Sequence, residues 1–287
     1  MVYIVLVNYN SSDDTIDCVN SIEQSNYRDY RIIIVDNCSN DKEKEKLKLI
    51  SSKPTVDLIC SNKNSGWASA CNIGMKKAVD DNVEYVMLLN NDTLVDSDFI
   101  QSFMDNIEKF PKLGMVSSKI IYESQRNRIW SAGGYYDKFR CTGIMGKYKQ
   151  IDHEPKGLIE EATFLTGCSV LIPVEAIRQV GYFDESYFMY ADDLEYSRRF
   201  LKFGYKLYYF SDSIIYHKVS AASGGEYSPF YCEWCTRSNL KYIREHGEKK
   251  VIAYILFAVF FVAKIGYFLL HGKFKQIRSL FKGLRRK

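Results

Sequence analysis

Short runs of consecutive apolar residues recur through the first third of the chain, and apolar residues between the runs return every three or four positions. The runs are typical of strands buried on both faces, and the segments between them are typical of amphipathic helices. The runs lie at 3–8, 31–36, 56–60 and 84–89. This alternation predicts a parallel sheet flanked by helices, hence an α/β fold. Residues 111–172 predict shorter strands and loops, with a turn at Gly133 and Gly134.

Polar residues follow the fourth apolar run directly. Asn90, Asn91 and Asp92 stand where that strand ends, and open α/β sheets bind ligands at the carboxyl ends of their strands. One carboxylate between amides suits a divalent cation that carries a diphosphate, because Mg²⁺ and Mn²⁺ take oxygen ligands and keep positions free for phosphate oxygens. A polar turn without a ligand is the alternative interpretation.

An unusual acidic pair lies in residues 181–199, GYFDESYFMYADDLEYSRR. Asp192 and Asp193 are surrounded there by aromatic residues and open a predicted helix over 191–203. A carboxylate fixed at a helix N-terminus stays ionised and can take a proton from a hydroxyl. Acids are also favoured in a first helical turn for capping alone, so this pattern by itself leaves both interpretations open.

His217 closes another apolar strand, predicted over 213–216, and is one of only four histidines in the chain. A lone histidine after a strand is more often a hydrogen-bonding residue than a metal ligand. Its position, one strand after the acidic helix, is what makes it a candidate ligand.

Five motifs in this order resemble the inverting family 2 glycosyltransferases of the GT-A fold, and especially their rhamnosyltransferase-like branch. The family's V-x-x-Y-N, VDN-x-S-x-D and glycine-rich blocks are matched by IVLVNYNSS, VDNCSND and NSGWASACNIG. Its N-x-D motif is matched by NND. Its last block, T-G followed later by E-D, is matched by TG and then by residues 181–193. These matches begin at positions 4, 35, 64, 90 and 166, and the resemblance covers about residues 1–245.

The resemblance implies a Rossmann-like mixed sheet flanked by helices and transfer of a sugar from a nucleotide-diphosphate donor. Among donors it favours dTDP-rhamnose, followed by UDP-sugars, and it implies Mn²⁺ or Mg²⁺ as the cofactor. The implied donor-binding residues are Asn8, Asp36, Asn64, Gly66, Asn72, Asn90 and Asn91. The implied metal ligands are Asp92 and His217. Asp193 matches the catalytic base, with Asp192, Thr166 and Gly167 on the acceptor side.

Several positions depart from the family pattern. Ala70 and Cys71 replace a Gly and an Asn, Asp192 replaces a Glu, and Glu195 stands where Asp is common. The acidic replacements keep their charge. Cys71 removes one amide, so the donor sugar is expected to deviate from the commonest one.

Two other functions remain open on the same scaffold. A membrane-recruited binding subunit that has lost catalysis is disfavoured because Asp92, Asp193 and His217 are all retained. A sugar nucleotidyltransferase is disfavoured because its glycine-rich basic loop is replaced by NYNSS after the first strand. The chain also shows no Ser nucleophile elbow and no Walker lysine loop.

Composition agrees with a cytosolic enzyme. The 287 residues are 46% hydrophobic, enough for one large α/β core. Met1 runs straight into the first strand, so we expect no signal peptide. Eight cysteines lack the spacing of a disulfide scaffold, which suits a reducing compartment. Cys232 and Cys235 form a CxxC in a predicted helix, and without a second pair we interpret them as ordinary thiols.

The last 37 residues change character. They hold no acid and eight basic residues, whereas the rest of the chain carries a net charge of −4. Residues 251–270 are apolar and long enough to span a bilayer. Apolar residues also recur at helical spacing among the basic ones of the tail, at Phe274, Ile277, Phe281 and Leu284.

We therefore divide the chain into a catalytic domain over 1–245 and a membrane-associating segment over 246–287. A monotopic anchor on anionic lipid at the cytoplasmic face is favoured, because a single span would place the basic tail against the positive-inside tendency. A single span and a helix that forms a homo-oligomer are the alternatives. Nucleic acid is not expected as a partner, because the tail carries an apolar stripe. The expected acceptor is a lipid-linked glycan of bacterial surface polysaccharide synthesis.

Overall fold

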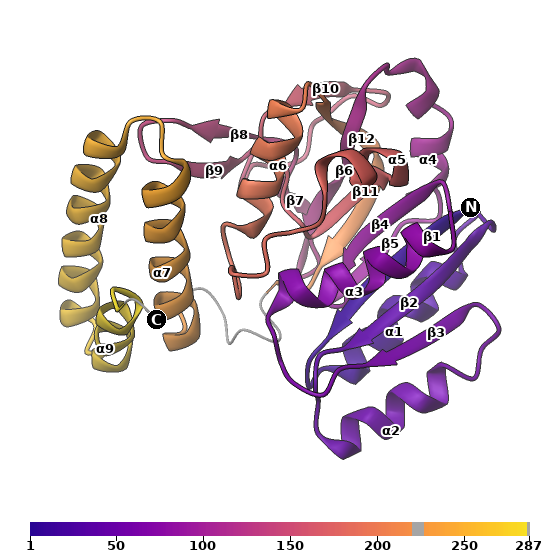
Figure 1. The fold of residues 1–287 in the computed structure, drawn as a ribbon, viewed down its shortest axis with the longest axis horizontal. Coiled ribbons are helices and arrows are strands. Elements are labelled where there is room, and N and C mark those ends of the chain that lie inside the picture. The colour runs from indigo at the N-terminus through magenta and orange to yellow at the C-terminus, as the bar shows by residue number, and fades with distance from the viewer. Residues whose placement is uncertain (220–226, 286–287) are drawn as a thin grey trace.

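The computed structural model describes residues 1–219 and 227–285 (Figure 1). The helices are α1 (Ser12–Glu23), α2 (Asp41–Ile50), α3 (Trp67–Asp80), α4 (Gln101–Met104), η1 (Ile107–Lys109, a 3₁₀ turn), α5 (Val174–Val180), α6 (Asp192–Lys202), α7 (Pro229–His246), α8 (Lys250–Leu270) and α9 (Phe274–Gly283). The strands are β1 (Val2–Asn8), β2 (Tyr30–Asp36), β3 (Val56–Cys60), β4 (Tyr85–Asn90), β5 (Thr93–Val95), β6 (Leu113–Tyr122), β7 (Gln125–Ser131), β8 (Gly134–Asp137), β9 (Thr142–Met145), β10 (Ile159–Ala162), β11 (Ser169–Pro173) and β12 (Lys206–His217).

The main sheet is mixed, with the strand order β10-β12-β6-β11-β4-β1-β2-β3. Strands β3, β2, β1 and β4 are parallel neighbours, as the four apolar runs predicted. Strand β11 enters antiparallel between β4 and β6, and β12 is parallel to β6. The α/β prediction is therefore confirmed, and the antiparallel insertion makes the sheet mixed.

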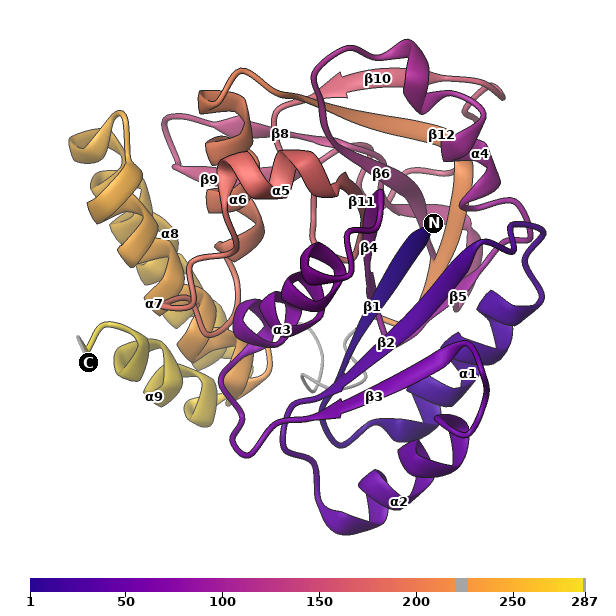
Figure 2. The ribbon, with the colours of Figure 1, turned by 45° about the vertical axis from the view of Figure 1, so that its right-hand side comes forward.

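Helices cover both faces of this sheet (Figure 2). On one face, alternate residues of β1 and β2 pack with the apolar sides of α1, α2 and α4. On the other face, the remaining alternate residues pack with α3, α5 and α6. Every second residue of a strand points to the same face, so continuous apolar strands are needed to fill both layers.

The prediction of short strands over residues 111–172 is wrong for its first part. Strand β6 runs for ten residues, all but its last buried, and lies inside the sheet between β11 and β12. The predicted strand 213–216 is the end of a longer strand, β12, which begins at Lys206. The predicted turn at Gly133 is present between β7 and β8, where the residue has a φ of +63°.

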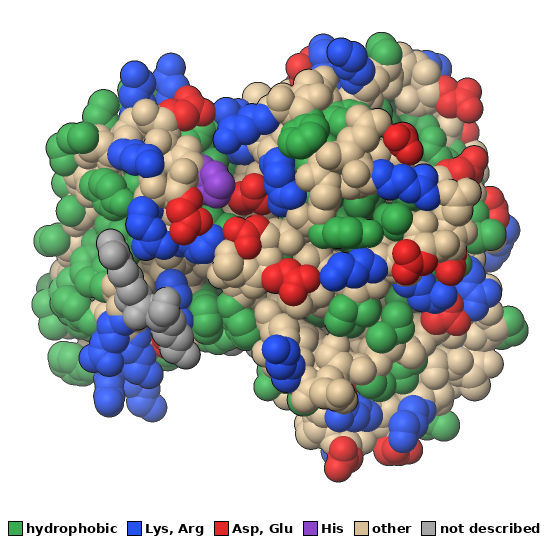
Figure 3. Space-filling model, in the orientation of Figure 1, with side chains coloured by type: hydrophobic (Ala, Val, Ile, Leu, Met, Phe, Trp, Pro, Cys, Tyr) green, Lys and Arg blue, Asp and Glu red, His purple; other side chains and the backbone are tan. Residues whose placement is uncertain are grey.

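The C-terminal helices stand beside the sheet domain, with α7 and α8 side by side and α9 folded back at their end (Figure 1). Helix α8 has 21 residues and is long and apolar enough to cross a membrane by length and composition, with 11% of its most apolar stretch buried. Apolar side chains gather over this region in Figure 3, and basic ones gather near α9. The predicted amphipathic tail forms α9, whereas Arg286 and Lys287 lie outside the described residues.

Candidate active site

Asp92 and His217 meet although 125 positions separate them in the chain. Strand β5 follows Asp92 and pairs antiparallel with the end of β12, so that Thr93 lies opposite His217. This pairing sets Oδ1 of Asp92 3.1 Å from Nε2 of His217, and both side chains are buried. The indole of Trp130 meets the imidazole edge-on, with ring centroids 4.6 Å apart, and fixes its plane.

This pair fits a divalent ion. The pair offers a carboxylate oxygen and an imidazole nitrogen, two atoms that divalent transition-metal ions bind. Nδ1 of His217 is buried without a hydrogen-bond partner. In residues 1–219 and 227–285, no group of three or more His, Cys, Asp and Glu side chains is arranged to hold a metal. Among the described residues, Asp92 and His217 are therefore the side chains that would hold the ion.

The electrostatics of the pair depend on that ion. Burial lowers the pKa of His217, but its neighbours Cys168 and Asp92 outweigh burial and raise the pKa to about 10. A protonated imidazole would neutralise the charge of Asp92. A bound cation would take over this role and require the neutral imidazole.

The acidic pair stands at the start of α6, as predicted; Asp192 is buried and Asp193 is half-buried. Tyr190 and Ala191 precede it with φ values of +67° and +60°. Two successive non-glycine residues in the left-handed region are costly, and such strain persists where the surrounding structure enforces it. The turn sharply reverses the chain before the two acids.

The two carboxylates differ in environment. Asp193 accepts hydrogen bonds from the N–H groups of Gly167 at 3.4 Å and Leu194 at 2.8 Å. Burial raises the pKa of Asp193, and these hydrogen bonds limit the rise. Burial also raises the pKa of Asp192, and the charge of Asp193 raises it further. Asp193 is therefore the more readily ionised member, which suits a proton acceptor working near neutral pH.

The segment Thr166–Cys168 brings the Asp92–His217 pair and the acidic pair together. The Cys168 carbonyl accepts from the N–H of Asn90 at 2.9 Å, beside Asp92, while Gly167 donates to Asp193. Gly167 must be glycine, because a Cβ there would lie 2.3 Å from the ring of Trp67. Asp92, His217 and Asp193 thus converge at the carboxyl end of the sheet.

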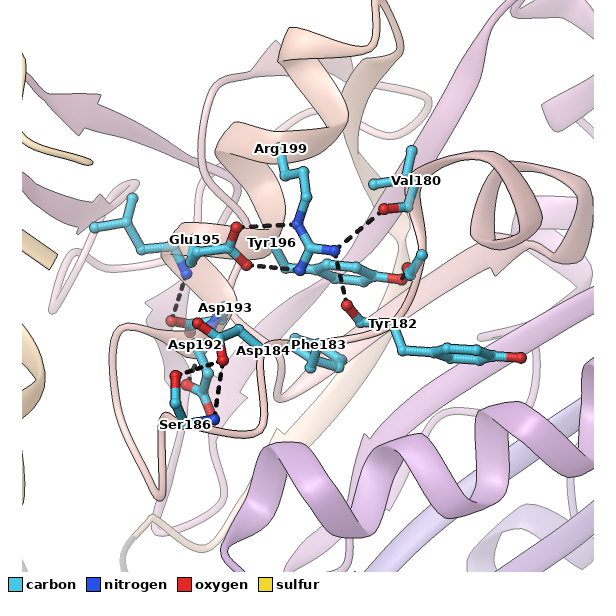
Figure 4. A network of polar contacts seen from close by, with 12 residues as sticks. Val180, Tyr182, Phe183, Asp184, Ser186, Asp192, Asp193, Glu195, Tyr196 and Arg199 are labelled. Carbon is cyan, nitrogen blue, oxygen red and sulfur yellow. Dashed lines mark hydrogen bonds and ion pairs between the residues drawn. The ribbon is translucent and has the colours of Figure 1, made fainter. Parts of the chain in front are cut away.

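Arg199 ties α6 to the chain that leads into the acidic pair (Figure 4). Its guanidinium donates to both carboxylate oxygens of Glu195, at 2.9 and 2.7 Å. The remaining nitrogen donates to the carbonyls of Val180 at 3.1 Å and Tyr182 at 2.7 Å. The planar fork of arginine satisfies a carboxylate and two backbone carbonyls at once, which lysine cannot do.

The predicted donor residues Asn8, Asp36 and Asn91 share one polar network where β1, β2 and β4 end. Asn8 and Asp36 are opposite one another in the sheet, and the amide of Asn8 donates to Oδ1 of Asp36 at 2.9 Å. Thr15 links them to Asn91 by hydrogen bonds of 2.9 and 2.8 Å. Asn90 lies at the end of β4 beside them. The network places these side chains together at the strand ends.

Gly66 and Asn72 contact the loop that precedes the acidic pair. A Cβ at Gly66, which has a φ of +91°, would lie 2.2 Å from the carbonyl oxygen of Phe188. Asn72 uses both ends of its amide on the backbone of Phe183, at 2.9 and 3.0 Å. The Oδ1 atom of Asn64 accepts from the N–H of Gly66 and shapes the turn before α3. This geometry ties the third motif to the loop before the acidic pair.

Sequence reasoning missed the roles of Arg199, Trp130 and Trp67. Arg199 lies four residues after Glu195, a spacing that predicts an ion pair on a helix, but the carbonyl partners come from a different element. No sequence pattern predicts that Trp130 contacts the imidazole of His217 or that Trp67 lies against Gly167. The cysteines of the CxxC are free: Cys232 is buried and Cys235 is half-buried.

Comparison with solved structures identifies the class of fold. The chain is similar to GalNAc-T7 crystallised with UDP, GalNAc and Mn²⁺, with a TM-score of 0.66 and 17% identity over 85% of this chain and 47% of that one. It is similar to the Pyrobaculum calidifontis mannosyltransferase PcManGT in complex with GDP-Man and Mn²⁺, with a TM-score of 0.61 and 14% identity over 98% and 85%. For S. aureus TarS with UDP the TM-score is 0.55 at 15% identity, over 88% and 69%. These likenesses show the GT-A fold.

The family model named glycosyl transferase family 2 matches residues 3–181, more than half of the chain. The chain therefore belongs to glycosyl transferase family 2. It is 26% identical to a poly-β-1,6-N-acetyl-D-glucosamine synthase of Staphylococcus epidermidis over 221 residues, which is 77% of this chain and 50% of that protein. Staphylococcus aureus synthases match over the same length at 25–26% identity. The chain spans about half the length of the curated relatives it matches.

Proposed function

We propose that this protein transfers a sugar from a nucleotide-diphosphate donor to a glycan acceptor, with inversion at the anomeric carbon. The observation that carries the proposal is the convergence of the buried Asp92–His217 pair and the half-buried carboxylate of Asp193 through the segment Thr166–Cys168. A diphosphate leaving group needs a cation beside it, and an acceptor hydroxyl needs a base. Membership of the family supports the same reaction.

In this mechanism the chain's residues hold the reactants and move one proton. Asp92 and His217 would hold a divalent ion, which would neutralise the charge that develops on the diphosphate. Asp193 accepts the proton of the acceptor hydroxyl as its oxygen bonds to the anomeric carbon, and the bond from that carbon to the diphosphate breaks. The products are the lengthened glycan and the nucleotide diphosphate. A single displacement requires no enzyme nucleophile, unlike retaining glycoside hydrolysis.

The motifs and the matched relatives favour different donor sugars. The motif pattern favours rhamnose from dTDP, whereas the matched relatives carry a name that refers to N-acetylglucosamine polymers. Cys71, which replaces the family's usual amide, is buried in the apolar face of α3 and does not reach solvent. We place UDP-N-acetylhexosamine first and dTDP-rhamnose second, with polysaccharide synthesis as the pathway class.

The proposal includes attachment to an anionic membrane surface, with the catalytic domain over residues 1–245 on the cytoplasmic side. Helix α9 returns to α7, where a Cβ at Gly283 would touch the backbone of Glu233 and where Arg237 donates to the carbonyl of Lys282. A single span by α8 would place α9 across the bilayer from the catalytic domain, which contradicts these contacts. An anchor that lies in the interface keeps them.

A thermal-shift panel of nucleotide sugars with and without Mn²⁺ tests this function. A ligand present at one hundred times its Kd stabilises the native state by about 2.7 kcal/mol. For a chain of this size that corresponds to a rise in Tm of roughly 5 °C. One nucleotide sugar should produce the shift, and chelation should abolish it. No shift with any donor would favour a scaffold that has lost catalysis, and a shift that survives chelation would remove the metal from the mechanism.

A further inference from the structure

A cavity of about 140 Å³ lies outside the active site, between the β8–β9 hairpin, α7 and α8. The turn of the hairpin contributes Arg140, α7 contributes Asn239, and α8 contributes Phe257, Phe260 and Lys264. The lining therefore combines two cations, an amide and an aromatic wall. No step of the proposed transfer uses these residues.

The two cations of the cavity lack acidic partners in the part of the chain that the structure describes. The guanidinium of Arg140 lies over the ring of Phe260 at 4.7 Å, and Nζ of Lys264 lies 5.9 Å from the ring centroid of Tyr231. Cations elsewhere on α7 are paired, as Arg237 with Glu233 and Lys241 with Glu245 show. Two cations that line one cavity without an acid would stabilise an anion bound there.

The chemistry of the lining narrows the anion. An arginine fork and a lysine ammonium are the usual ligands of phosphate oxygens. The aromatic wall belongs to α8, whose outward face is an unbroken apolar stripe with Val251, Ile255, Val259 and Val262 between 58% and 74% exposed. A free phosphate would use only the cations, whereas a lipid phosphate would use the cations and the apolar stripe together.

We propose that this cavity binds the phosphate of a single anionic lipid, whose hydrocarbon chain lies along the exposed face of α8. The inference rests on the membrane attachment proposed above and adds a defined lipid site to it. A general attraction of the basic tail to a charged surface would depend on the number of positive charges. A lipid site depends on Arg140 and Lys264 in particular, because these two residues line the cavity.

Helix α7 lies between the cavity and the loop that precedes the acidic pair. Its residues hold that loop: Ser238 donates to the carbonyl of Met189 at 2.7 Å, and the rings of Trp234 and Phe188 stack at 4.3 Å. A bound lipid thus lies one helix diameter, about 10 Å, from the loop. Lipid occupancy would hold α7 against the catalytic domain.

Calorimetry on the full chain with short-chain lipids below their micelle concentration tests the proposal. The probes are dihexanoylphosphatidylglycerol, the zwitterionic dihexanoylphosphatidylcholine, and glycerol phosphate. The anionic lipid should bind at least about tenfold more tightly than the zwitterionic one, as a charge-assisted contact to each cation implies. Arg140→Gln and Lys264→Gln should each weaken its binding by about tenfold.

Lys275→Gln is the matched control, because it removes one exposed positive charge from α9 outside the cavity. It should leave binding of the monomeric lipid within about twofold, the scale of an exposed charge in salt. Equal losses with Lys275→Gln and Lys264→Gln, or equal affinity for the zwitterionic lipid, would overturn the site. Equal affinity for glycerol phosphate would overturn the role of the chain. Nucleotide-sugar binding, measured on the same variants, confirms that they are folded and reports separately on the transferase function.

Discussion

Arg199→Lys tests whether the guanidinium, rather than its charge, holds the acidic helix in place. Lysine keeps one positive charge but cannot donate to Glu195 and to the carbonyls of Val180 and Tyr182 together. The side chain of Arg199 is 22% exposed and that of Glu195 is 10% exposed, so water replaces the lost contacts only in part.

The expected loss of stability is about 2 kcal/mol, at about 1 kcal/mol for each carbonyl that loses its donor. The entropy of unfolding is about 2.1 cal/mol/K per residue, so the 287 residues give about 0.6 kcal/mol/K and a fall in Tm of about 3 °C. Turnover should fall while donor binding is kept, because Arg199 positions the helix of Asp193 and contacts no donor-side residue.

Differential scanning fluorimetry and steady-state kinetics measure the two effects. Arg198→Lys is the matched control, since Arg198 is 23% exposed on the same helix and forms one ion pair, with Glu248. It should cost at most about 1 kcal/mol, as surface pairs do. Equal small losses for both variants would refute the positioning role of Arg199. A loss of donor binding in Arg199→Lys alone would show that the contact serves the donor side instead.

Four further outcomes are expected. Asp92→Ala should abolish the Mn²⁺-dependent thermal shift with nucleotide sugars and leave the ligand-free Tm within a few degrees, and an unchanged shift would remove Asp92 from the metal site. Asp193→Asn should keep donor binding and lower turnover by roughly 100-fold; near-normal turnover would give the base to Asp192. Because burial raises the pKa of Asp192, its ionisation costs stability as pH rises from about 4 through the raised value. Asp192→Asn should therefore raise Tm at pH 9 and leave it almost unchanged at pH 4, and a gain independent of pH would contradict this. Lys275→Gln with Arg278→Gln should weaken binding to anionic vesicles by about 1 kcal/mol per charge, and unchanged partitioning would exclude α9 from the membrane contact.

The strands and helices predicted correctly from the sequence are those whose burial produces a visible pattern of apolar residues. Strands β1 to β4 lie inside a parallel sheet, so both faces require apolar residues and the runs become visible. Strand β6 carries three polar residues, Ser117, Ser118 and Lys119, which are buried within the sheet and hide it from a hydrophobicity pattern. The predicted helix over 191–203 is confirmed by α6, because its acids and its apolar face are both local signals.

Contacts between distant elements could not be predicted. The pairing of β5 with β12 decides that Asp92 meets His217, and no local pattern specifies that register. Motif resemblance did not indicate that the backbone of Gly66 approaches Phe188, in the loop before the acidic pair. The resemblance identifies which residues belong to the site, and the structure shows which partners each of them has. The donor roles of Asn64, Gly66 and Asn72 remain predictions.

The junction between α3 and the loop before α6 limits how this enzyme can be recombined with its relatives. The backbone N–H of Trp67 donates to the carbonyl of Phe188 at 2.9 Å, and the side-chain amide of Asn72 forms two hydrogen bonds with the backbone of Phe183. A chimaera that exchanges only the first 110 residues would bring a foreign α3 against this loop. Without an Asn at position 72 it would lose the two hydrogen bonds to Phe183. A chimaera that keeps this junction therefore takes residues 64–74 and 181–193 from the same parent, although more than one hundred positions separate them.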